Sequence, residues 1–354
     1  MSIFGSKGEW SINDNDTSLD GFAALHLYFS GPPFTEGPFG RILLQMVRTL
    51  LTVMFLGLFP ASTGGTTDAL QAVQFSVAPP APVFSVAGRL SASGVVILDI
   101  ESGQSVYSRD ARVQRPMASL TKLMTAILIV ENHDLSETVT VPKSAESAVG
   151  NKVYLTAGKN YRVGDLLSAL LVNSANDAAI TLALFHSGSL QTFVEEMNTR
   201  ALQLGLKGTS FQNPIGLDHP SHWSTPRDIA WLTAFALRNA EIEKRMGMAG
   251  ATIASLDGTE TVRLYHTNVL MHDPAMAAAE GPTVVAGKTG TTDDAGECLV
   301  SVVEESGHRY VVVLLGSLQR YKDMDVILGD MATAFRPSAI PVQAAAEHPS
   351  IASH

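Results

Sequence analysis

The chain has 354 residues, of which 45% are hydrophobic and 16% charged, so it can bury a substantial core. Its formal net charge is −10, and its lysines and arginines are scattered, which excludes the basic surface typical of nucleic-acid-binding proteins. A single cysteine, Cys298, excludes an intrachain disulfide. Because Cys298 begins an apolar stretch that predicts a strand, we interpret it as a small buried hydrophobic residue and not as a nucleophile.

Three regions are predicted along the chain. Residues 1–84 form an N-terminal extension in which Arg41 and Arg48 precede the apolar run 50–59 and a small, polar stretch. This order is the layout of a secretory signal, and the run is shorter than the ~20 residues that span a bilayer. We therefore expect export to the periplasm or cell envelope, with membrane contact only through this segment if it is uncleaved. Residues 85–337 are predicted to form one folded domain, and residues 338–354 a disordered tail.

Hydrophobic periodicity and turn residues predict the elements of the folded domain. Helices are predicted from Pro116 to about Val130, in two segments between 163 and 184, over 190–204, from a Thr225 cap onward and over 324–335. Strands are predicted at 93–100, 105–107, 283–288, 297–303 and 309–315, with a further hairpin turning at Asp257-Gly258. Strands at both ends with helices between them predict an α+β domain whose terminal segments share an antiparallel sheet.

Ser119-Leu120-Thr121-Lys122 lies at the start of the first predicted helix. Residues three apart lie on one helix face, so the amine of Lys122 can reach the hydroxyl of Ser119. A serine hydroxyl is a poor nucleophile until a neighbouring base takes its proton. The spacing therefore predicts an activated serine, although such a pair also occurs by chance on ordinary helices.

Two further short motifs follow in the chain. Ser174-Ala175-Asn176 lies between the two helical segments, and Lys288-Thr289-Gly290 follows an apolar strand. Each triplet alone is a weak signal, but the order Ser-x-x-Lys, Ser-x-Asn, Lys-Thr-Gly is the combination found in penicillin-binding proteins and class A β-lactamases. The conjunction is far more specific than its parts.

The region from about residue 93 to residue 335 resembles the serine D-alanyl-D-alanine carboxypeptidases, the low-molecular-mass penicillin-binding proteins. Beyond the three motifs, the resemblance covers the segments 115–125, 210–217 and 224–228. It implies that 85–337 is a D,D-peptidase catalytic domain, with a helical subdomain packed against a five-stranded antiparallel sheet and the site between them. It implies peptidoglycan stem peptides as substrates and β-lactams as covalent inhibitors.

The resemblance also implies a role for each motif residue. Ser119 would be the acylated nucleophile, Lys122 its proton acceptor, and Ser174 the relay to the leaving D-alanine. Asn176 would hold the substrate amide, while Lys288 and Thr289 would bind the substrate carboxylate. The backbone amides of Ser119 and Thr291 would form the oxyanion hole, where one donor contributes roughly 3–4 kcal/mol in related chemistry.

The proposed role of Lys122 requires a strongly lowered pKa. At the reference pKa of about 10.4, only ~0.04% of its amine would be neutral at pH 7. Burial and a second nearby cation both lower a lysine pKa, and Lys288 can supply that cation. We therefore expect the two ammonium groups to face each other across the site.

Other chemistries fit the sequence less well. A phosphate-binding loop ending at Lys288 needs glycine at position 282, where Pro282 stands, so no nucleotide is expected. A class A β-lactamase would carry Glu-x-x-Leu-Asn between the second and third motifs, and the sequence lacks it. His219 and His222 flank a proline in a loop and are interpreted as surface residues, so neither metal nor cofactor is expected.

Two peptidase activities remain open, together with a non-catalytic alternative. The stretch 173–179 is similar to that of the carboxypeptidases, which remove the terminal D-alanine, whereas 294–300 is similar to that of the D,D-endopeptidases, which cut D-alanyl cross-links. We prefer the carboxypeptidase. A penicillin-binding or cell-wall-binding protein without activity would be favoured if Ser119 or Lys122 were missing, and both are present.

Overall fold

The computed structural model describes residues 86, 88–272 and 281–335. The signal-like segment, the predicted boundaries at 85 and 337 and the predicted tail all lie outside these residues. The predicted division of the chain into three regions therefore stays a prediction.

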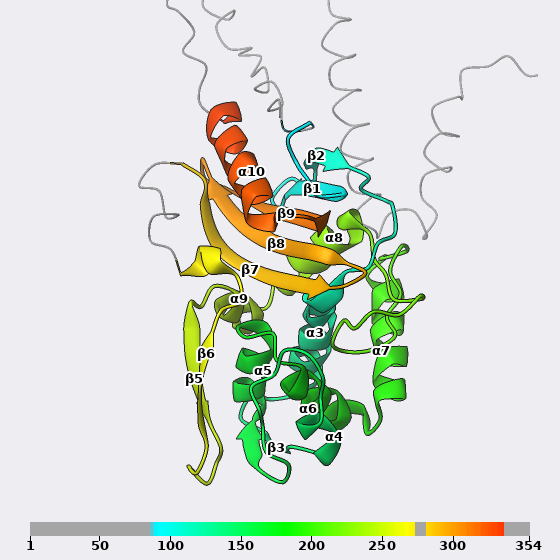
Figure 1. Cartoon of the computed structure of the whole chain (residues 1–354), viewed down its shortest axis with the longest axis vertical. Coiled ribbons are helices and arrows are strands. Elements are labelled where there is room, and N and C mark those ends of the chain that lie inside the picture. The colour runs from blue at the N-terminus through cyan, green and yellow to red at the C-terminus, as the bar shows by residue number, and fades with distance from the viewer. Residues whose placement is uncertain (1–85, 87, 273–280, 336–354) are drawn as a thin grey trace, which may run out of the picture. The chain divides into compact units, whose positions relative to one another are not determined.

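A five-stranded antiparallel sheet forms one half of the described domain (Figure 1). Its order is β2-β1-β9-β8-β7, so the N-terminal hairpin pairs with the last strand of the chain. This arrangement confirms the predicted α+β fold. The strands are β1 (Gly94–Asp99), β2 (Ser105–Arg109), β7 (Thr283–Thr292), β8 (Gly296–Glu305) and β9 (His308–Ser317).

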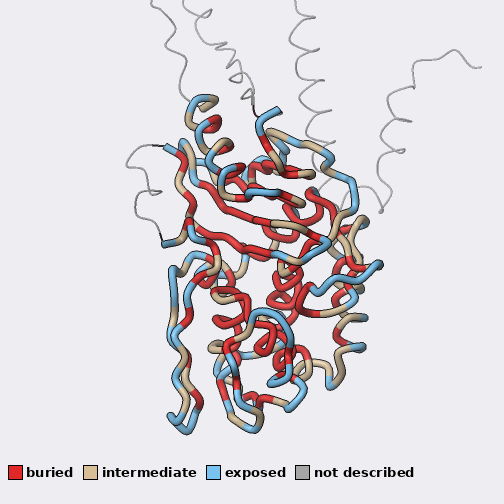
Figure 2. The backbone as a smooth tube through the Cα atoms, viewed as in Figure 1, coloured by how far each residue is buried: buried red, intermediate tan, exposed pale blue. Residues whose placement is uncertain are grey.

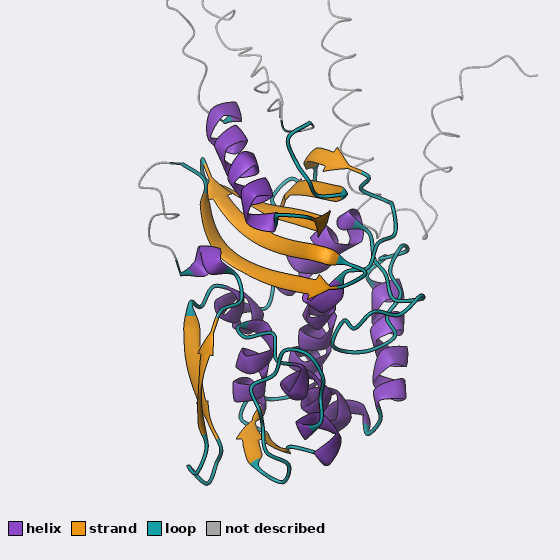
Figure 3. Ribbon diagram, in the orientation of Figure 1, coloured by secondary structure: helices purple, strands orange, loops and turns teal. Residues whose placement is uncertain are grey.

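Most of the helices between β2 and β7 gather on one side of the sheet and form the helical half of the domain (Figure 3). They are η1 (Ala118–Thr121), α3 (Lys122–Asn132), α4 (Lys143–Glu146), α5 (Val163–Leu171), α6 (Asn176–Ser187), α7 (Leu190–Gln203), α8 (Pro226–Ala236), α9 (Ala240–Met246) and η2 (Val269–Met271). Two small antiparallel pairs flank them, β3 (Thr138–Thr140) with β4 (Asn160–Arg162) and β5 (Gly250–Ala254) with β6 (Thr261–Tyr265). The last helix, α10 (Arg320–Ala334), follows β9.

The core divides along the sheet, because each face of its central strands is covered by a different set of helices (Figure 2). One face packs on α10 through Met324, Ile327 and Met331. The other face joins the larger core of the helical half, in which α3 is buried along almost its whole length. A helix buried on all sides can place a polar group where water is excluded, which is the setting of the site described below.

The structure shifts three predicted boundaries. The first helix begins with the 3-10 turn η1 at Ala118, because Pro116 and Met117 precede it in a segment whose Arg115 pairs with Ser224. Strand β7 continues past Lys288 to Thr292, since it stays paired with β8 over that length. Helix α10 starts at Arg320 instead of residue 324, and the carboxylate of Glu297 accepts the Arg320 backbone N–H there at 2.8 Å.

The buried carboxylate of Asp323 ties α10 to the first described segment of the chain. It accepts hydrogen bonds from Ser91 N at 2.7 Å, Ala92 N at 2.8 Å and Ser317 Oγ at 2.6 Å. These donors come from both ends of the domain, so one side chain joins the chain segments on either side of the helical half.

We predict that Asp323→Ala lowers the free energy of unfolding by about 3 kcal/mol, because several buried donors lose their acceptor. Urea unfolding followed by circular dichroism measures this. Asp325→Ala removes an exposed carboxylate from the same helix and should change stability by less than about 0.5 kcal/mol. Equal stability of the two variants would contradict the role given to Asp323.

Candidate active site

The 3-10 turn η1, which contains Ser119, packs against strand β7. Lys122 is the first residue of α3, fully buried, and its Nζ lies 2.8 Å from Ser119 Oγ. Ala118, directly before the serine, has a φ of +48°, an unfavourable conformation for a residue with a side chain. Strain of this kind gathers at functional sites, where the surrounding packing enforces it.

The loop around Ile215 closes the other side of this pair. The carbonyl oxygen of Ile215 accepts a hydrogen bond from Lys122 Nζ at 2.7 Å and lies 3.3 Å from Ser119 Oγ. Asn213 shapes the loop, since its Oδ1 accepts the amides of Ile215, Gly216 and Leu217. A Cβ on Gly216, whose φ is +87°, would lie 2.0 Å from the Ala118 oxygen, so only glycine fits there.

Ser174 lies in the tight turn between α5 and α6, with a φ of +62°. Its Oγ accepts a hydrogen bond from Lys288 Nζ at 2.7 Å, and the same ammonium donates to the Thr289 carbonyl at 2.8 Å. The second and third motifs therefore meet directly, although 174 and 288 lie on opposite halves of the domain.

Strand β7 brings its Lys-Thr-Gly segment to the nucleophile turn. Thr289 Oγ1 donates to Thr267 Oγ1 at 2.6 Å, which holds the strand to the segment before η2. A Cβ on Gly290 would lie 2.9 Å from Ser119 N, so the glycine keeps the space in front of that amide open. The backbone of Thr291 follows at the same edge, as an oxyanion hole built from residues 119 and 291 requires.

These residues line one cleft of about 300 Å³. Of the predicted site residues, the cleft is lined by Ser119, Ser174, Thr289 and Thr291. Lys122 and Lys288 are buried beside it and form hydrogen bonds with Ser119 and Ser174, respectively. The other lining residues are Asn151, Thr267, Gly290, Glu297, Arg320 and Tyr321.

Asn176 is the predicted site residue that the structure does not bring to the cleft wall. Its side chain is 5% exposed, and its Nδ2 donates to the Val149 carbonyl at 2.7 Å. Asn151 lines the cleft instead, and its backbone oxygen accepts the Asn176 amide at 2.8 Å. The sequence offered no motif for Asn151, because the contact joins a loop to a helix start 25 residues away (176 − 151).

Burial is the main influence on the protonation of the two lysines, and neighbouring positive charges add to it. Burial, and then the charge of Lys288, lower the pKa of Lys122 far below its usual value, with a smaller opposing effect of Asp177. Burial, and then Arg320, lower the pKa of Lys288 to about 7. The lowered pKa favours the neutral amine of Lys122, the form that can accept a proton, and the charge of Lys288 contributes to that lowering.

Sequence reasoning missed the guanidinium of Arg320. It is 7% exposed and donates to the carbonyls of Gly290 and Cys298, each at 2.9 Å, as well as to Thr291 Oγ1. Its Nε also lies 3.2 Å from Glu297 Oε2. A second fixed cation therefore stands beside the Lys-Thr-Gly strand, where an anionic substrate group would be attracted.

The sequence predicts Cys298 in the core and His222 on the surface. Cys298 is fully buried, and burial raises the pKa of its thiol to about 11, which confirms an unreactive residue. The interpretation of His222 as a surface residue is wrong. It is 3% exposed, because its ring packs edge-on against Phe211 and hydrogen-bonds on both sides.

Comparison with known proteins decides the family. Residues 77–318 match the sequence profile of D-alanyl-D-alanine carboxypeptidase. The chain belongs to the D-alanyl-D-alanine carboxypeptidase family. It is 31% identical over 231 residues to the D-alanyl-D-alanine carboxypeptidase DacF of Bacillus subtilis, covering 64% of this chain and 57% of the relative. The chain thus spans little more than half the length of that relative.

Solved structures of the family share the fold. A D-alanyl-D-alanine carboxypeptidase from Mycobacterium tuberculosis aligns with a TM-score of 0.62 at 29% identity, over 75% of this chain and 98% of that one. A Streptomyces DD-transpeptidase aligns with a TM-score of 0.62 at 26% identity, over 68% and 97%. These neighbours agree with the sheet and helical half described above.

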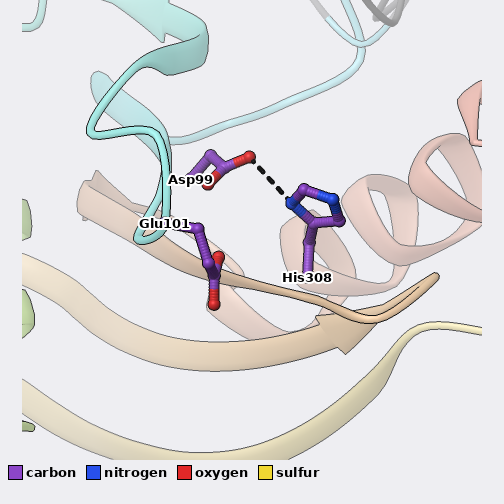
Figure 4. A group of neighbouring side chains, drawn as sticks. All are labelled: Asp99, Glu101 and His308. Carbon is purple, nitrogen blue, oxygen red and sulfur yellow. Dashed lines mark ion pairs between the residues drawn. The ribbon is translucent and has the colours of Figure 1, made fainter.

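One group in the described part of this family member has the side chains of a metal site (Figure 4). Asp99, Glu101 and His308 lie at one end of the sheet with ligand atoms within 4.8 Å of one another. Each already has a partner in the protein, since His308 Nδ1 pairs with Asp99 Oδ2 at 3.3 Å and Glu101 Oε2 accepts the Arg309 amide at 3.1 Å. These contacts account for the positions of the three side chains.

Among the helices of residues 88–272 and 281–335, none combines the length and the apolar character that crossing a membrane requires.

We predict that Lys288→Ala slows acylation by a β-lactam and moves the rising limb of its pH profile to higher pH. Removing the neighbouring cation raises the pKa of Lys122, so its amine becomes neutral only at higher pH. Stopped-flow acylation across pH 5–10 measures this, with Lys288→Arg as the control that keeps the charge. Acylation of Lys288→Ala at the normal rate and pH would refute the electrostatic role.

Proposed function

We propose that this protein is a serine D,D-peptidase that removes the terminal D-alanine from peptidoglycan stem peptides. The observation that supports it most strongly is the contact of 2.8 Å between Lys122 Nζ and Ser119 Oγ, in a buried setting that lowers the lysine pKa. An ordinary surface lysine would be charged and could not accept a proton. Family membership and the named activities of the relatives point the same way.

The chemistry follows from this contact. Ser119 Oγ attacks the carbonyl carbon of the penultimate D-alanine while its proton passes to the neutral amine of Lys122. The negative charge that develops on the carbonyl oxygen is stabilised by the amides of Ser119 and Thr291. When the tetrahedral intermediate collapses, the peptide C–N bond breaks and the leaving D-alanine nitrogen takes a proton, delivered from Lys122 through Ser174.

Water then completes the cycle. It gives a proton to Lys122 and attacks the carbonyl carbon of the acyl-enzyme ester. The bond from that carbon to Ser119 Oγ then breaks, Lys122 returns the proton to Ser119 Oγ, and the shortened stem peptide is released. Both halves use the same base and the same oxyanion donors, so the site needs no metal or cofactor.

The sheet side of the cleft supplies the recognition of the substrate carboxylate. Thr289 and Arg320 line the cleft, and the buried Lys288 reaches its edge through the hydrogen bond to Ser174 Oγ. A carboxylate placed there raises the pKa of Lys288 above its resting value of about 7, so binding holds this ammonium charged. A free terminal carboxylate is the feature that separates a carboxypeptidase substrate from an internal peptide bond.

We predict that the purified protein releases free D-alanine from a stem pentapeptide ending in D-Ala-D-Ala. Product analysis by mass spectrometry measures this, with Ser119→Ala as the matched control, because that change removes only the attacking oxygen. A cross-linked muropeptide in a parallel reaction should stay intact. Cleavage of the cross-link without release from the pentapeptide would reject the carboxypeptidase in favour of the endopeptidase.

The endopeptidase is the second candidate because of the segment that joins β7 to β8 and continues into β8. Residues 294–300 are similar to those of the endopeptidases, and one of them, Glu297 near the start of β8, lines the cleft. Cross-linked and terminal D-alanyl bonds share the attacked carbonyl, so the same serine and lysine would serve both reactions.

We further predict that a penicilloyl group stays attached to Ser119 for a long time. The sequence lacks the Glu-x-x-Leu-Asn segment that activates the deacylating water of class A β-lactamases. Labelling with a fluorescent penicillin, removal of the excess and electrophoresis over hours measures the loss of label, and peptide mass spectrometry locates it. Rapid loss of the label would indicate a β-lactamase, and a label on Ser119→Ala would reject the nucleophile.

Export to the cell envelope fits this substrate, since stem peptides lie outside the cytoplasmic membrane. The signal-like segment around residues 41–67 supports that location. The proposed partners are therefore peptidoglycan stem peptides, and β-lactams as covalent inhibitors.

A further inference from the structure

His222 lies behind the nucleophile turn and outside the catalytic motifs. Its Nδ1 accepts the backbone N–H of Gln212 at 2.9 Å, and its Nε2 lies 2.7 Å from Thr121 Oγ1. Thr121 directly precedes Lys122, is fully buried and is not among the residues that line the cleft. A buried imidazole with partners at both nitrogens is held in one orientation.

The direction of the hydrogens follows from the partners. A backbone amide can only donate, so Nδ1 is the acceptor and the neutral ring carries its proton on Nε2. That proton goes to Thr121 Oγ1, and the threonine hydroxyl in turn donates to the Ala118 carbonyl at 2.8 Å. Burial lowers the pKa of His222 to about 4, so the ring keeps this neutral form at neutral pH.

The end of this chain of hydrogen bonds is the peptide unit of the oxyanion hole. The carbonyl oxygen of Ala118 and the N–H of Ser119 belong to the same planar peptide group, so fixing one fixes the direction of the other. Ala118 holds this peptide in a strained conformation, with a φ of +48°. A strained peptide turns away unless its surroundings hold it, and Thr121 supplies a hydrogen bond that does so.

We propose that His222 is a positioning residue which, through Thr121, aims the Ser119 amide at the carbonyl oxygen of the substrate. This inference rests on the proposed function, because it assigns the Ser119 amide to the oxyanion hole. It concerns only the rate of the covalent step. The groups proposed to bind the substrate carboxylate lie on β7 and α10, and the contacts of His222 do not reach them.

The test separates covalent acylation from non-covalent binding, using the full chain and a chromogenic cephalosporin in stopped flow. His222→Asn keeps an acceptor near Gln212 but cannot reach Thr121, and we expect its acylation rate constant to fall about 10²-fold. The non-covalent dissociation constant should stay within about twofold of the parent. His222→Gln, whose longer amide can reach Thr121, should recover most of the rate.

Thr121 supplies an independent arm of the same test. Thr121→Val removes the hydroxyl and should lose as much rate as His222→Asn, whereas Thr121→Ser keeps the hydroxyl and should retain the parent rate. The double variant His222→Asn/Thr121→Val should be no slower than either single variant, because both act through one contact with Ala118. His219→Asn, on the exposed part of the same loop, is the matched control and should acylate normally.

The outcomes distinguish this inference from the function on which it rests. Rate constants are taken from single exponentials of the acylated fraction, so loss of folded protein does not imitate a slower step. A parent protein that is never acylated at Ser119 would overturn the proposed function. A parent that is acylated, with His222→Asn equally fast or with additive losses in the double variant, would overturn the role of His222 alone.

Discussion

The burial of two lysine side chains beside one cleft is the constraint on which the site depends. Lys122 belongs to the helical half and Lys288 to the sheet, and both are fully buried. An isolated ammonium in such a place costs several kcal/mol, so each lysine needs either hydrogen-bond acceptors or the loss of its proton. Lys122 Nζ contacts Ser119 Oγ and the Ile215 carbonyl, a set of partners that suits a neutral amine. Lys288 Nζ donates to Ser174 Oγ and to the Thr289 carbonyl.

The same constraint explains why the site is made of backbone as much as of side chains. A low-dielectric site can hold few charges, so carbonyls and amides must supply the remaining polar contacts. The Ile215 carbonyl orients Lys122, and the glycines at 216 and 290 let neighbouring backbone approach the Ser119 amide. A Cβ at position 216 would collide with the Ala118 oxygen, and a Cβ at position 290 would lie 2.9 Å from the Ser119 amide nitrogen.

Much of this arrangement could be predicted from the sequence, for identifiable reasons. Strands β1, β7, β8 and β9 are apolar runs bounded by turn residues, and the cap at Thr225 follows a local pattern that the structure confirms, since Thr225 Oγ1 accepts the Asp228 amide at 3.0 Å. The motif serines and lysines were found because the three short motifs occur together and in a recognisable order, and the helical spacing of Ser119 and Lys122 explains their contact.

What could not be predicted depends on contacts between distant segments. Arg320 reaches the cleft only because α10 begins beside β8, and Asn151 replaces Asn176 at the cleft wall because a loop crosses the start of α6. His222 was misassigned because proline and serine neighbours predict an exposed loop, whereas its ring turns inward onto Phe211. Local sequence reports the backbone conformation, and it carries no signal for the direction in which a loop side chain points.

The division of the site between two halves of the domain has a chemical consequence. Ser119, Lys122 and Ser174, the residues proposed to carry the reaction, come from the helical half, while Lys288, Thr289 and Arg320 come from the sheet and α10. In the proposed reaction the sheet would hold the substrate by its carboxylate, whereas the nucleophile Ser119 belongs to the helical half. Binding of the carboxylate therefore does not position the nucleophile. In the proposed reaction this alignment has to come from the protein, and the positive φ angles at residues 118 and 174 fall in the two turns that carry the serines.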